Sequence, residues 1–536
     1  MSLNCFFFAL LFILLSITIS SGETGINKKQ EKYKILGVFG HIGKSHFDVF
    51  KVLLEELARR GHDVTVISYF PRDNVSSPLP NYRDISLLDE LDIDVNVVNL
   101  NLIKHTPWKL ITELMVLREK GLLCCEKALK LPRVQEFIRS NEKFDLILTE
   151  VFNSDCFLGF VHRFKAPFIS LSSHIMMPWA KSRIANLDNP SYVPHIFYGF
   201  STNMNFIERM INTVSWPFIE LFYEVGFNWP TQPLVEEAFG PGVPPLSEIA
   251  KNTSMIFVNS HYSLHGAVPT LPSVIEVGGI HVTSVQPLTE DLKRFLDNAH
   301  EGVLFFSWGS MIRASSMSNK TLTKILYVLR SIPRKVIWKW EVEELPNKPP
   351  NVLIRKWLPQ AAILRHPNVK CYLAHGGMLG ISEGVSAGVP MVVVPMYGDQ
   401  FNNAAAAKER GVAIVLEWNN FNAKSLRSAI DRVFNDSSYQ KNAKLLQKAW
   451  NDRPETPLQT AVWWTEYVAR GNGNKYLKSS AASLSWYQIT LIDVVIVLVM
   501  VLAMLVFIIY RIIRMLVRSL LKTDRSNVQM MKKKQN

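Results

Sequence analysis

Residues 33–68, "YKILGVFGHIGKSHFDVFKVLLEELARRGHDVTVIS", decide the fold class of this chain. A buried strand over residues 33–39 is followed by a helix over residues 45–61, and a second strand follows over residues 62–68. Ser45 is expected to cap the helix. One helix face is apolar at helical spacing and carries Phe47, Phe50, Leu53, Leu54 and Leu57. Two strands joined by a helix form a βαβ unit, which predicts a parallel sheet.

The letters Gly43-Lys44-Ser45 in this stretch suggest a phosphate-binding P-loop. That pattern requires four residues between its first glycine and the Gly-Lys-Ser, which places the glycine at position 38. Position 38 is Val38, so consecutive backbone N–H groups cannot curl around a phosphate in the required way. A P-loop hydrolase is therefore not expected, Lys44 is expected to be a solvated loop charge, and His46 becomes the residue of interest.

The chain is long enough for two or three domains, because its 536 residues, 48% of them apolar, exceed one ordinary core. Residues 144–150 and 166–172 are further strands of the first half. A second alternating series follows, with strands expected at residues 303–309, 335–340, 351–357, 370–377, 389–395 and 412–418. Two doubly wound α/β domains, residues 23–287 and 288–485, are expected to face each other across a ligand cleft.

Apolar runs at both ends of the chain predict a secreted body with a membrane anchor. Residues 1–22 are typical of a cleavable secretory signal, and residues 489–510 are long enough to cross a bilayer. The last segment, residues 511–536, holds eight Lys or Arg and one acid, out of a formal net charge of +13 for the chain. The positive-inside rule makes this tail cytoplasmic and the body lumenal. Membrane topology thus explains the basic composition, and no nucleic-acid partner is expected.

Cysteines and glycosylation sequons add weaker indications. Cys5 leaves with the signal, and four cysteines remain without metal-ligand spacing or a disulfide framework, which predicts buried thiols at Cys124, Cys125, Cys156 and Cys371. Four Asn-x-Ser/Thr sequons are compatible with a lumenal glycoprotein and lie at Asn74, Asn252, Asn319 and Asn435.

The densest set of polar motifs lies in residues 355–404, "RKWLPQAAILRHPNVKCYLAHGGMLGISEGVSAGVPMVVVPMYGDQFNNA". A strand is expected to end in a histidine and two glycines, which allow close backbone approach, and the helix that follows offers free N–H groups to a diphosphate. A tryptophan can stack on a base, and acidic and amide side chains can bond ribose and sugar hydroxyls. The residues with these roles are Trp357, Gln360, His375, Gly377, Glu383, Asp399 and Gln400.

This segment resembles the signature of the UDP-dependent glycosyltransferases, in particular the membrane-anchored UDP-glycosyltransferase family of animals and its insect members. The likeness extends over the signal, both halves, the span and the basic tail. It implies a GT-B fold, in which two Rossmann-like domains face a cleft and the C-terminal domain holds most of the sugar nucleotide. It makes the seven residues just named donor contacts, and it matches Ser310 in "FSWGSM" to a serine that contacts phosphate. Leu379 departs from the pattern, because vertebrate members have an asparagine there.

The resemblance also assigns His46. In the family, a histidine just after the first strand is the general base, and "KSHF" matches that place. The first turn of a helix suits this role, because the positive end of the helix dipole disfavours the imidazolium and keeps the ring basic. A catalytic histidine also needs a carboxylate to fix its tautomer. Two acids occur at the matching place in "FDLILTEVFNSDCFLG", and we expect Asp155 to be the partner, with Glu150 as the alternative.

The resemblance implies inverting transfer of a sugar from a UDP-sugar to a hydroxyl of a small lipophilic acceptor. Likeness to insect members favours UDP-glucose over UDP-glucuronate. No metal or other cofactor is expected, because the donor segment has no Asp-x-Asp cluster. The acceptor is expected near residues 174–180, "HIMMPWA". The alternative is a non-catalytic membrane protein on the same scaffold that binds sugar nucleotides or lipophilic molecules.

The end of the chain, "KKQN", predicts location in the endoplasmic reticulum. Lys533 and Lys534 stand at the fourth and third positions from the end of the predicted cytoplasmic tail, as in dilysine retrieval signals of related membrane enzymes. The protein is thus expected to be a single-pass type I membrane protein, and homo- or hetero-oligomers are compatible with this topology.

Overall fold

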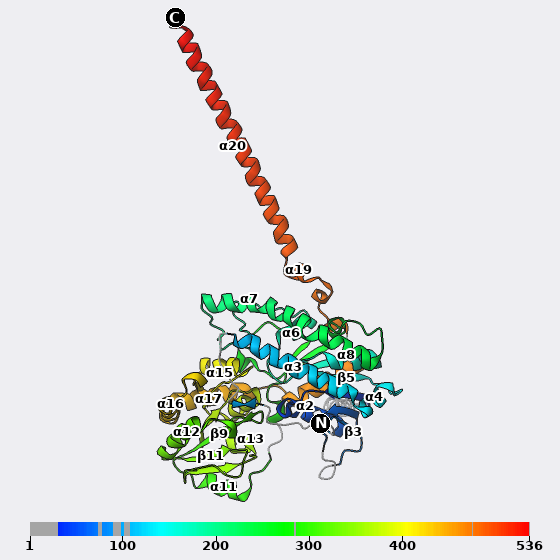
Figure 1. The fold of residues 1–536 in the computed structure, drawn as a ribbon, viewed down its shortest axis with the longest axis vertical. Helices are drawn as coiled ribbons and strands as arrows, with labels where there is room; N and C mark the ends of the chain where they lie inside the picture. The colour runs from blue at the N-terminus through cyan, green and yellow to red at the C-terminus, as the bar shows by residue number, and fades with distance from the viewer. Residues whose placement is uncertain are drawn as a thin grey trace, which may run out of the picture.

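The computed structural model describes residues 31–72, 78–88, 98–100, 108–282, 286–473 and 475–534. Two α/β halves lie side by side, and one long helix projects from the body (Figure 1). The predicted signal, residues 1–22, and the sequon at Asn74 lie outside the described residues. The other three sequons are exposed, at Asn252, Asn319 and Asn435.

The N-terminal half is built on a seven-stranded parallel sheet in the order β3-β2-β1-β5-β6-β7-β8. Its strands are β1 (Lys34–Phe39), β2 (Asp63–Ser68), β3 (Tyr82–Ser86), β5 (Leu146–Glu150), β6 (Phe168–Ser172), β7 (Met255–Val258) and β8 (Val274–Glu276). Four of these strands were predicted. The sequence analysis did not identify β3, β7 and β8, which lie in the outer part of the sheet. The strand order reverses between β1 and β5, where doubly wound sheets bind their ligands.

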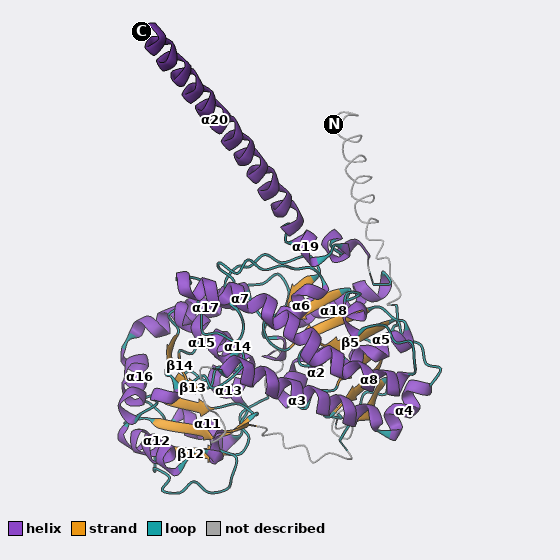
Figure 2. Ribbon diagram, turned by 45° about the horizontal axis from the view of Figure 1, so that its top comes forward, coloured by secondary structure: helices purple, strands orange, loops and turns teal. Residues whose placement is uncertain are grey.

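Helices cover both faces of this sheet (Figure 2), which is why its central strands are buried on both sides. The helices of this half are α2 (Lys44–Arg59), α3 (Lys109–Lys130), α4 (Pro132–Arg139), η2 (Cys156–Leu158), α5 (Gly159–Phe164), α6 (Pro178–Arg183), α7 (Phe206–Tyr223), the π-helical turn η3 (Glu224–Asn228), α8 (Trp229–Phe239), α9 (Leu246–Ala250), α10 (Tyr262–His265) and η4 (Ile280–Val282).

Helix α2 confirms the predicted apolar face, since all five side chains named for it are buried. Its start differs from the prediction. The helix begins at Lys44 with Gly43 as its N-cap, and the Gly43 carbonyl accepts from the N–H of His46 at 3.1 Å. Ser45 therefore lies inside the first turn, and Lys44 is not a solvated loop charge but a helix residue paired with Asp48 at 2.7 Å.

The C-terminal half has a six-stranded parallel sheet in the order β12-β11-β9-β13-β14-β15, and all six predicted strands are present. The strands are β9 (Val303–Ser307), β11 (Lys335–Lys339), β12 (Val352–Arg355), β13 (Val369–Ala374), β14 (Met391–Val393) and β15 (Ala413–Val415). The helices of this half are α11 (Glu290–Asp297), α12 (Asn319–Ser331), α13 (Gln360–Arg365), α14 (Met378–Ala387), α15 (Gln400–Glu409), α16 (Ala423–Asn435) and α17 (Ser437–Asn451). Its strand order reverses between β9 and β13.

Several segments cross between the halves, and two of them do so in opposite directions. Helix α18 (Pro457–Arg470) was predicted as part of the C-terminal domain, but it packs on α2 and its buried residues belong to the core of the N-terminal sheet. In the other direction, β4 (Val98–Asn99) pairs in parallel with β10 (Ile312–Arg313). Contacts of this kind hold the two halves against each other. One of the two segments follows the predicted domain boundary at residue 288 in the sequence, and the other precedes it.

Helix α20 (Ile492–Lys534) is long and apolar enough to cross a membrane over Ile492–Met531, and that segment is not buried against the body. The predicted span began at residue 489, but the short helix α19 (Trp486–Ile489) ends there and Leu491 has a positive φ of 57° between the two helices. The basic tail continues the same helix to Lys534.

One disulfide corrects the prediction of buried thiols. Cys125 of α3 is bonded to Cys156 of η2, which ties α3 to the loop after β5. Cys124 and Cys371 are buried free thiols, as predicted. The bonded pair lies 31 residues apart in sequence, and that spacing alone carried no sign of the contact.

Candidate active site

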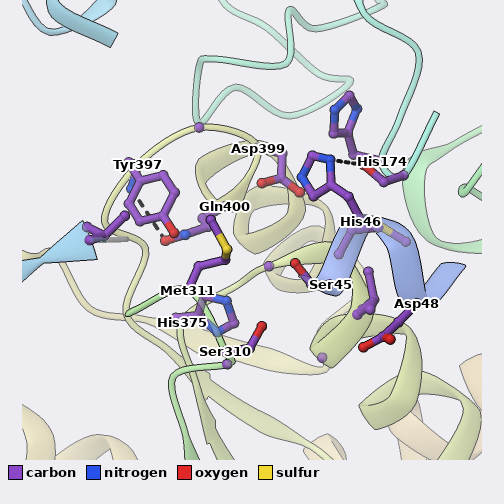
Figure 3. Close-up of a pocket in the computed structure, with 18 of the residues that line it drawn as sticks. Ser45, His46, Asp48, His174, Ser310, Met311, His375, Tyr397, Asp399 and Gln400 are labelled. Carbon is purple, nitrogen blue, oxygen red and sulfur yellow. Dashed lines mark hydrogen bonds between the residues drawn. The ribbon is translucent and has the colours of Figure 1, made fainter. Parts of the chain in front are cut away.

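A cavity of about 1060 Å³ lies between the two halves. It opens at the carboxyl ends of β1 and β5 on one side and of β9 and β13 on the other, so both points of strand-order reversal face it. Figure 3 shows His46 and its neighbours on the N-terminal side, opposite His375, Asp399 and Gln400. The fold thus places His46 and the predicted donor residues around one space.

His46 lies in the first turn of α2, directly after β1. Its imidazole is 17% exposed and lines the cavity. The ring packs edge-on against Phe152 with centroids 4.5 Å apart, and His41 lies 4.6 Å away on another side. Packing and the helix position therefore fix the orientation of this ring, as proton transfer to a bound substrate requires.

The carboxylate beside His46 belongs to Glu150, at the end of β5. Its Oε1 lies 2.6 Å from Nδ1 of His46, and the Ser173 hydroxyl lies 2.9 Å from the same nitrogen. A neutral imidazole that donates from Nδ1 to the carboxylate keeps Nε2 free to accept a proton. This is the geometry expected of a general base with its orienting acid.

Asp155, the partner preferred from the sequence, does not contact His46. Its carboxylate is buried and accepts from the guanidinium of Arg183 and from the hydroxyl of Tyr223 at 3.0 Å. Asp155 therefore ties α6 and the end of α7 to the loop after β5. The preference was wrong because a parallel strand brings its last residue, not the fifth residue beyond it, to the edge where β1 ends.

Burial governs the titration of the histidine and its acid. It lowers the pKa of His46 to about 3 and raises the pKa of Glu150 to about 7, because removal from water disfavours the charged form of each. The imidazole is thus held neutral at physiological pH. The acid titrates close to neutrality, so its carboxylate form is available to accept from Nδ1 at and above that pH.

The C-terminal side of the cavity is built around His375, which follows β13. Gly376 (φ 96°) turns the chain, and Gly377 is the N-cap of α14, whose first turn lines the cavity. A Cβ at Gly309 would lie 2.7 Å from the His375 ring, and one at Gly377 would clash with the ring as well. Both positions need glycine because the imidazole fills the space between them. Within the described residues, Nδ1 of His375 has no hydrogen-bond partner, and this buried ring lines the cavity.

Trp357, Gln360 and Glu383 form one edge of the cavity, as predicted from their shared segment. The Trp357 ring is 60% exposed, which leaves a face for stacking. Gln360 donates to Glu383, and burial raises the pKa of Glu383 to about 7. Lys44 reaches this edge from α2 and lies 5.5 Å from the Trp357 ring centroid.

Asp399 and Gln400 stand at the start of α15, and Ser310 follows β9 on the other side of His375. Asn403 donates to Asp399 at 2.8 Å, and burial raises the pKa of Asp399 to about 6. The side-chain oxygen of Gln400 accepts from the backbone N–H of Met396 at 2.9 Å, which shapes the preceding loop. All eight predicted donor residues thus line one cavity.

Comparison with known proteins identifies the family. The model described as "UDP-glucoronosyl and UDP-glucosyl transferase" matches residues 38–527. The chain belongs to this family.

Among its relatives, a UDP-glucosyltransferase 2 of Dactylopius coccus is 37% identical over 493 residues, which cover 92% of this chain and 93% of the relative. The human UDP-glucuronosyltransferase 2B15 is 31% identical, with 85% of this chain and 88% of that protein covered. Both names describe transfer from UDP-sugars. The chain is accordingly a UDP-glycosyltransferase.

Solved structures with the same architecture confirm the GT-B fold. Spinosyn forosaminyltransferase SpnP has a TM-score of 0.55 at 16% identity, and the match covers 82% of this chain and all (100%) of that one. The glycosyltransferase VinC, solved with DTDP, has a TM-score of 0.54 at 16% identity, with 82% and 99% covered. At this identity the likeness shows the fold alone.

The sequence reasoning missed several residues of this glycosyltransferase's cavity, among them Ser173 and Glu113. Ser173 follows β6, the strand next to β5, and the rule that parallel strands end at one edge could have found it. Glu113 of α3 carried no such signal. Its Oε1 accepts from the N–H of Gly398 at 3.3 Å, and burial raises its pKa. It links the N-terminal half to the loop that carries Asp399.

The predicted acceptor segment, residues 174–180, is only partly in the cavity. His174 lines it, whereas Met176, Met177 and Trp179 belong to a buried core cluster beneath. Their side chains point away because α6 packs against α7 there. Only the first residue of this run therefore lines the cavity, and the position of the acceptor stays a prediction. In the part of the chain that the structure describes, no group of His, Cys, Asp or Glu side chains is arranged to hold a metal ion.

Proposed function

We propose that this UDP-glycosyltransferase transfers glucose from UDP-glucose to a hydroxyl of a small lipophilic acceptor, with inversion at the anomeric carbon and without a metal. The proposal rests on the placement of the His46–Glu150 pair directly across one cavity from the donor residues. The name of the Dactylopius relative, a UDP-glucosyltransferase, supports glucose as the sugar.

The transfer step uses residues of both halves. Nε2 of His46 accepts the proton of the acceptor hydroxyl while that oxygen forms a bond to the anomeric carbon. The bond from the anomeric carbon to the diphosphate breaks, and its electron pair leaves on the β-phosphate oxygen. The N–H groups at the start of α14, Ser310 and His375 meet this charge. Glu150 balances the imidazolium until the proton is passed on.

The remaining donor residues bind the parts of UDP-glucose that do not react. Trp357 stacks on uracil and Gln360 bonds its polar edge, while Glu383 accepts from ribose hydroxyls. Asp399 and Gln400 bond the hydroxyls of the glucose. Binding energy from these groups holds the anomeric carbon within reach of the acceptor oxygen.

The acceptor side of the cavity favours an apolar molecule. Next to His46 it is lined by the side chains of Ile42, Val116, Leu117, Phe152 and Phe197, all from the N-terminal half. An aromatic or terpenoid alcohol would bury its ring there and present its hydroxyl to His46.

Turnover by membranes containing the expressed protein tests this function. We expect radiolabelled sugar to pass from UDP-glucose to a simple phenol, and UDP-glucuronate to be a poorer donor. His46→Ala should lower the single-turnover rate by about 10² to 10⁴-fold and leave UDP binding unchanged. His300→Ala, at an exposed histidine, is the control. Binding of UDP-glucose without turnover by the unaltered protein would instead indicate a non-catalytic binding protein.

We further propose that α20 anchors the protein in the endoplasmic reticulum membrane, with the body in the lumen. The length and apolar character of α20 support the anchor. The exposure of Asn252, Asn319 and Asn435 is compatible with glycosylation in that compartment. Glycosidase treatment should shift the electrophoretic mobility of the wild-type protein. Loss of this shift in a variant with Asn→Gln at all three positions would identify these sites, and the absence of a shift in the wild-type protein would contradict the lumenal assignment.

A further inference from the structure

Helix α7 carries a continuous apolar surface that the rest of the protein does not cover. Nine of its side chains are exposed, and Thr213 is the only one that is not a hydrocarbon, aromatic or thioether group. The other eight are Phe206, Ile207, Met210, Ile211, Val214, Pro217, Phe218 and Leu221. Val225 and Trp229 extend the surface into η3 and α8. Exposure reaches 66% at Val214 and 65% at Leu221, so these side chains are not covered by neighbouring elements.

The charged residues of α7 do not interrupt this surface. Glu208 caps the helix by accepting from the N–H of Asn205 at 2.8 Å, and Arg209 donates to the carbonyl of Met204 at 2.7 Å. Glu220 is only partly exposed and faces Lys181 of α6. Each charged side chain thus has a polar partner near the edge of the helix, and the outward face carries no charge.

The opposite side of α7 is fixed to the body. Ile219 and Tyr223 are buried, the Tyr223 ring stacks on Trp179 with centroids 4.4 Å apart, and its hydroxyl donates to Asp155. The helix therefore cannot rotate to hide its apolar face. A surface helix of a soluble protein is polar on its outer side, whereas a helix apolar on both sides is suited to a second apolar environment.

The position of α7 indicates which environment this is. It lies across the face of the body from which α20 leaves, in both views (Figures 1 and 2). Between the body and α20, Trp486 is 70% exposed and Tyr487 is 43% exposed, and such aromatic rings are typical of the membrane interface. If α20 crosses the bilayer as proposed above, this face of the body is turned towards the lipid.

We propose that α7 lies in the interface of the lumenal leaflet, with its exposed apolar face buried among the lipid chains. It attaches the body at a second place and stops the body from swinging freely on α20. Because the face has no charge, the attachment rests on apolar burial and does not depend on anionic lipids. This inference rests on the proposed anchor but not on the proposed reaction.

Fluorescence quenching of the full-length protein in phosphatidylcholine vesicles tests the inference. A single reactive cysteine is placed by Val214→Cys and labelled with an environment-sensitive fluorophore. The native cysteines give little background, because Cys5 belongs to the predicted signal, and of the four cysteines in the described residues two form a disulfide and two are buried. Tyr327→Cys on α12 is the matched control, since Tyr327 is 70% exposed on a helix at the other end of the body. Flotation of the vesicles checks the α20 anchor separately, and UDP binding checks folding.

We expect a blue-shifted label at position 214 that is quenched by a spin label on the lipid chains and not by iodide in the water. The label at position 327 should behave in the opposite way. Equal iodide quenching at both positions in protein that floats with the vesicles would overturn the proposal. Shielding from both quenchers that disappears on dilution in lipid would also overturn it, and would assign the face to a second copy of the chain. Leu221→Cys repeats the test if the first variant does not fold.

Discussion

At the scale of single residues, the site depends on one pairing that reverses the order of preference obtained from the sequence. Glu150 ends β5 and Asp155 lies five residues beyond it, and of these two buried acids only Glu150 reaches His46. The partners of each acid define its contribution. A carboxylate beside an imidazole fixes a tautomer, whereas a carboxylate beside a buried guanidinium holds elements together.

The first prediction separates these two acids. Glu150→Gln should lower the single-turnover rate by about 10² to 10⁴-fold, because an amide can leave the proton of His46 on the wrong nitrogen. Asp155→Asn should instead lower the free energy of unfolding by about 3 to 5 kcal/mol, because it leaves the buried Arg183 unpaired. Thermal unfolding and single-turnover transfer measure the two effects. A stable Asp155→Asn protein without activity, beside an active Glu150→Gln protein, would restore the original preference.

The second prediction concerns pH. Because the raised pKa of Glu150 is about 7, the acid is protonated below that pH, donates to Nδ1 and moves the imidazole proton to Nε2. The base is then lost, so kcat/KM should fall as the pH drops through about 7 and reach a plateau above it. Glu150→Gln should remove this acid limb, whereas Glu142→Gln, at a partly exposed glutamate paired with Arg83, should retain it. An unchanged limb in Glu150→Gln would assign the titration to another group.

At the scale of secondary-structure elements, α3 connects the two halves at the cavity. It carries the disulfide to η2 and lines the acceptor side. Through Glu113 it also holds Gly398, which directly precedes the sugar-binding Asp399 of the proposal. One helix thus links the positions of acceptor and donor sugar.

The third prediction tests this link. Glu113→Gln should raise the KM for UDP-glucose by about tenfold, which corresponds to ~1.4 kcal/mol. The amide oxygen of Gln accepts a weaker bond from the Gly398 N–H than a carboxylate does, because bonds to charged groups contribute about 1.5 to 3 kcal/mol and neutral ones about 0.5 to 1.5 kcal/mol. Affinity for UDP itself should not change, since the loop faces the sugar. Glu126→Gln, on the exposed side of α3, is the control for changes in the helix. A normal KM in Glu113→Gln would show that the contact with Gly398 does not position the loop.

At the scale of the whole molecule, the membrane-spanning part of α20 separates the body from the basic tail at the end of the helix. We therefore expect the tail alone to determine the cellular location of the protein. The fourth prediction is that Lys533→Ser with Lys534→Ser releases the protein from the endoplasmic reticulum, because retrieval needs both lysines. Acquired resistance of its glycans to endoglycosidase H would report the release. Lys522→Ser with Arg525→Ser removes the same charge from the tail and should not change location. Release by both pairs would mean that tail charge, not the dilysine pattern, retains the protein.

The sequence by itself determined many of the elements and the residues that line the C-terminal side of the cavity. Buried strands of β-branched and aromatic residues alternate with amphipathic helices, and these local patterns predicted both parallel sheets and all six strands of the C-terminal half. His46 and the donor residues were also found, because they follow strand ends in fixed motifs and parallel strands end at one edge of a sheet.

Only the tertiary structure decided the contacts between distant segments. The choice of Glu150, the Cys125–Cys156 disulfide and the contact of Glu113 with Gly398 each join residues from different elements. The return of α18 to the N-terminal core and the outward apolar face of α7 depend on which side of a helix the rest of the fold covers. Periodicity shows that a helix has an apolar face, but packing alone decides whether protein or another medium covers it.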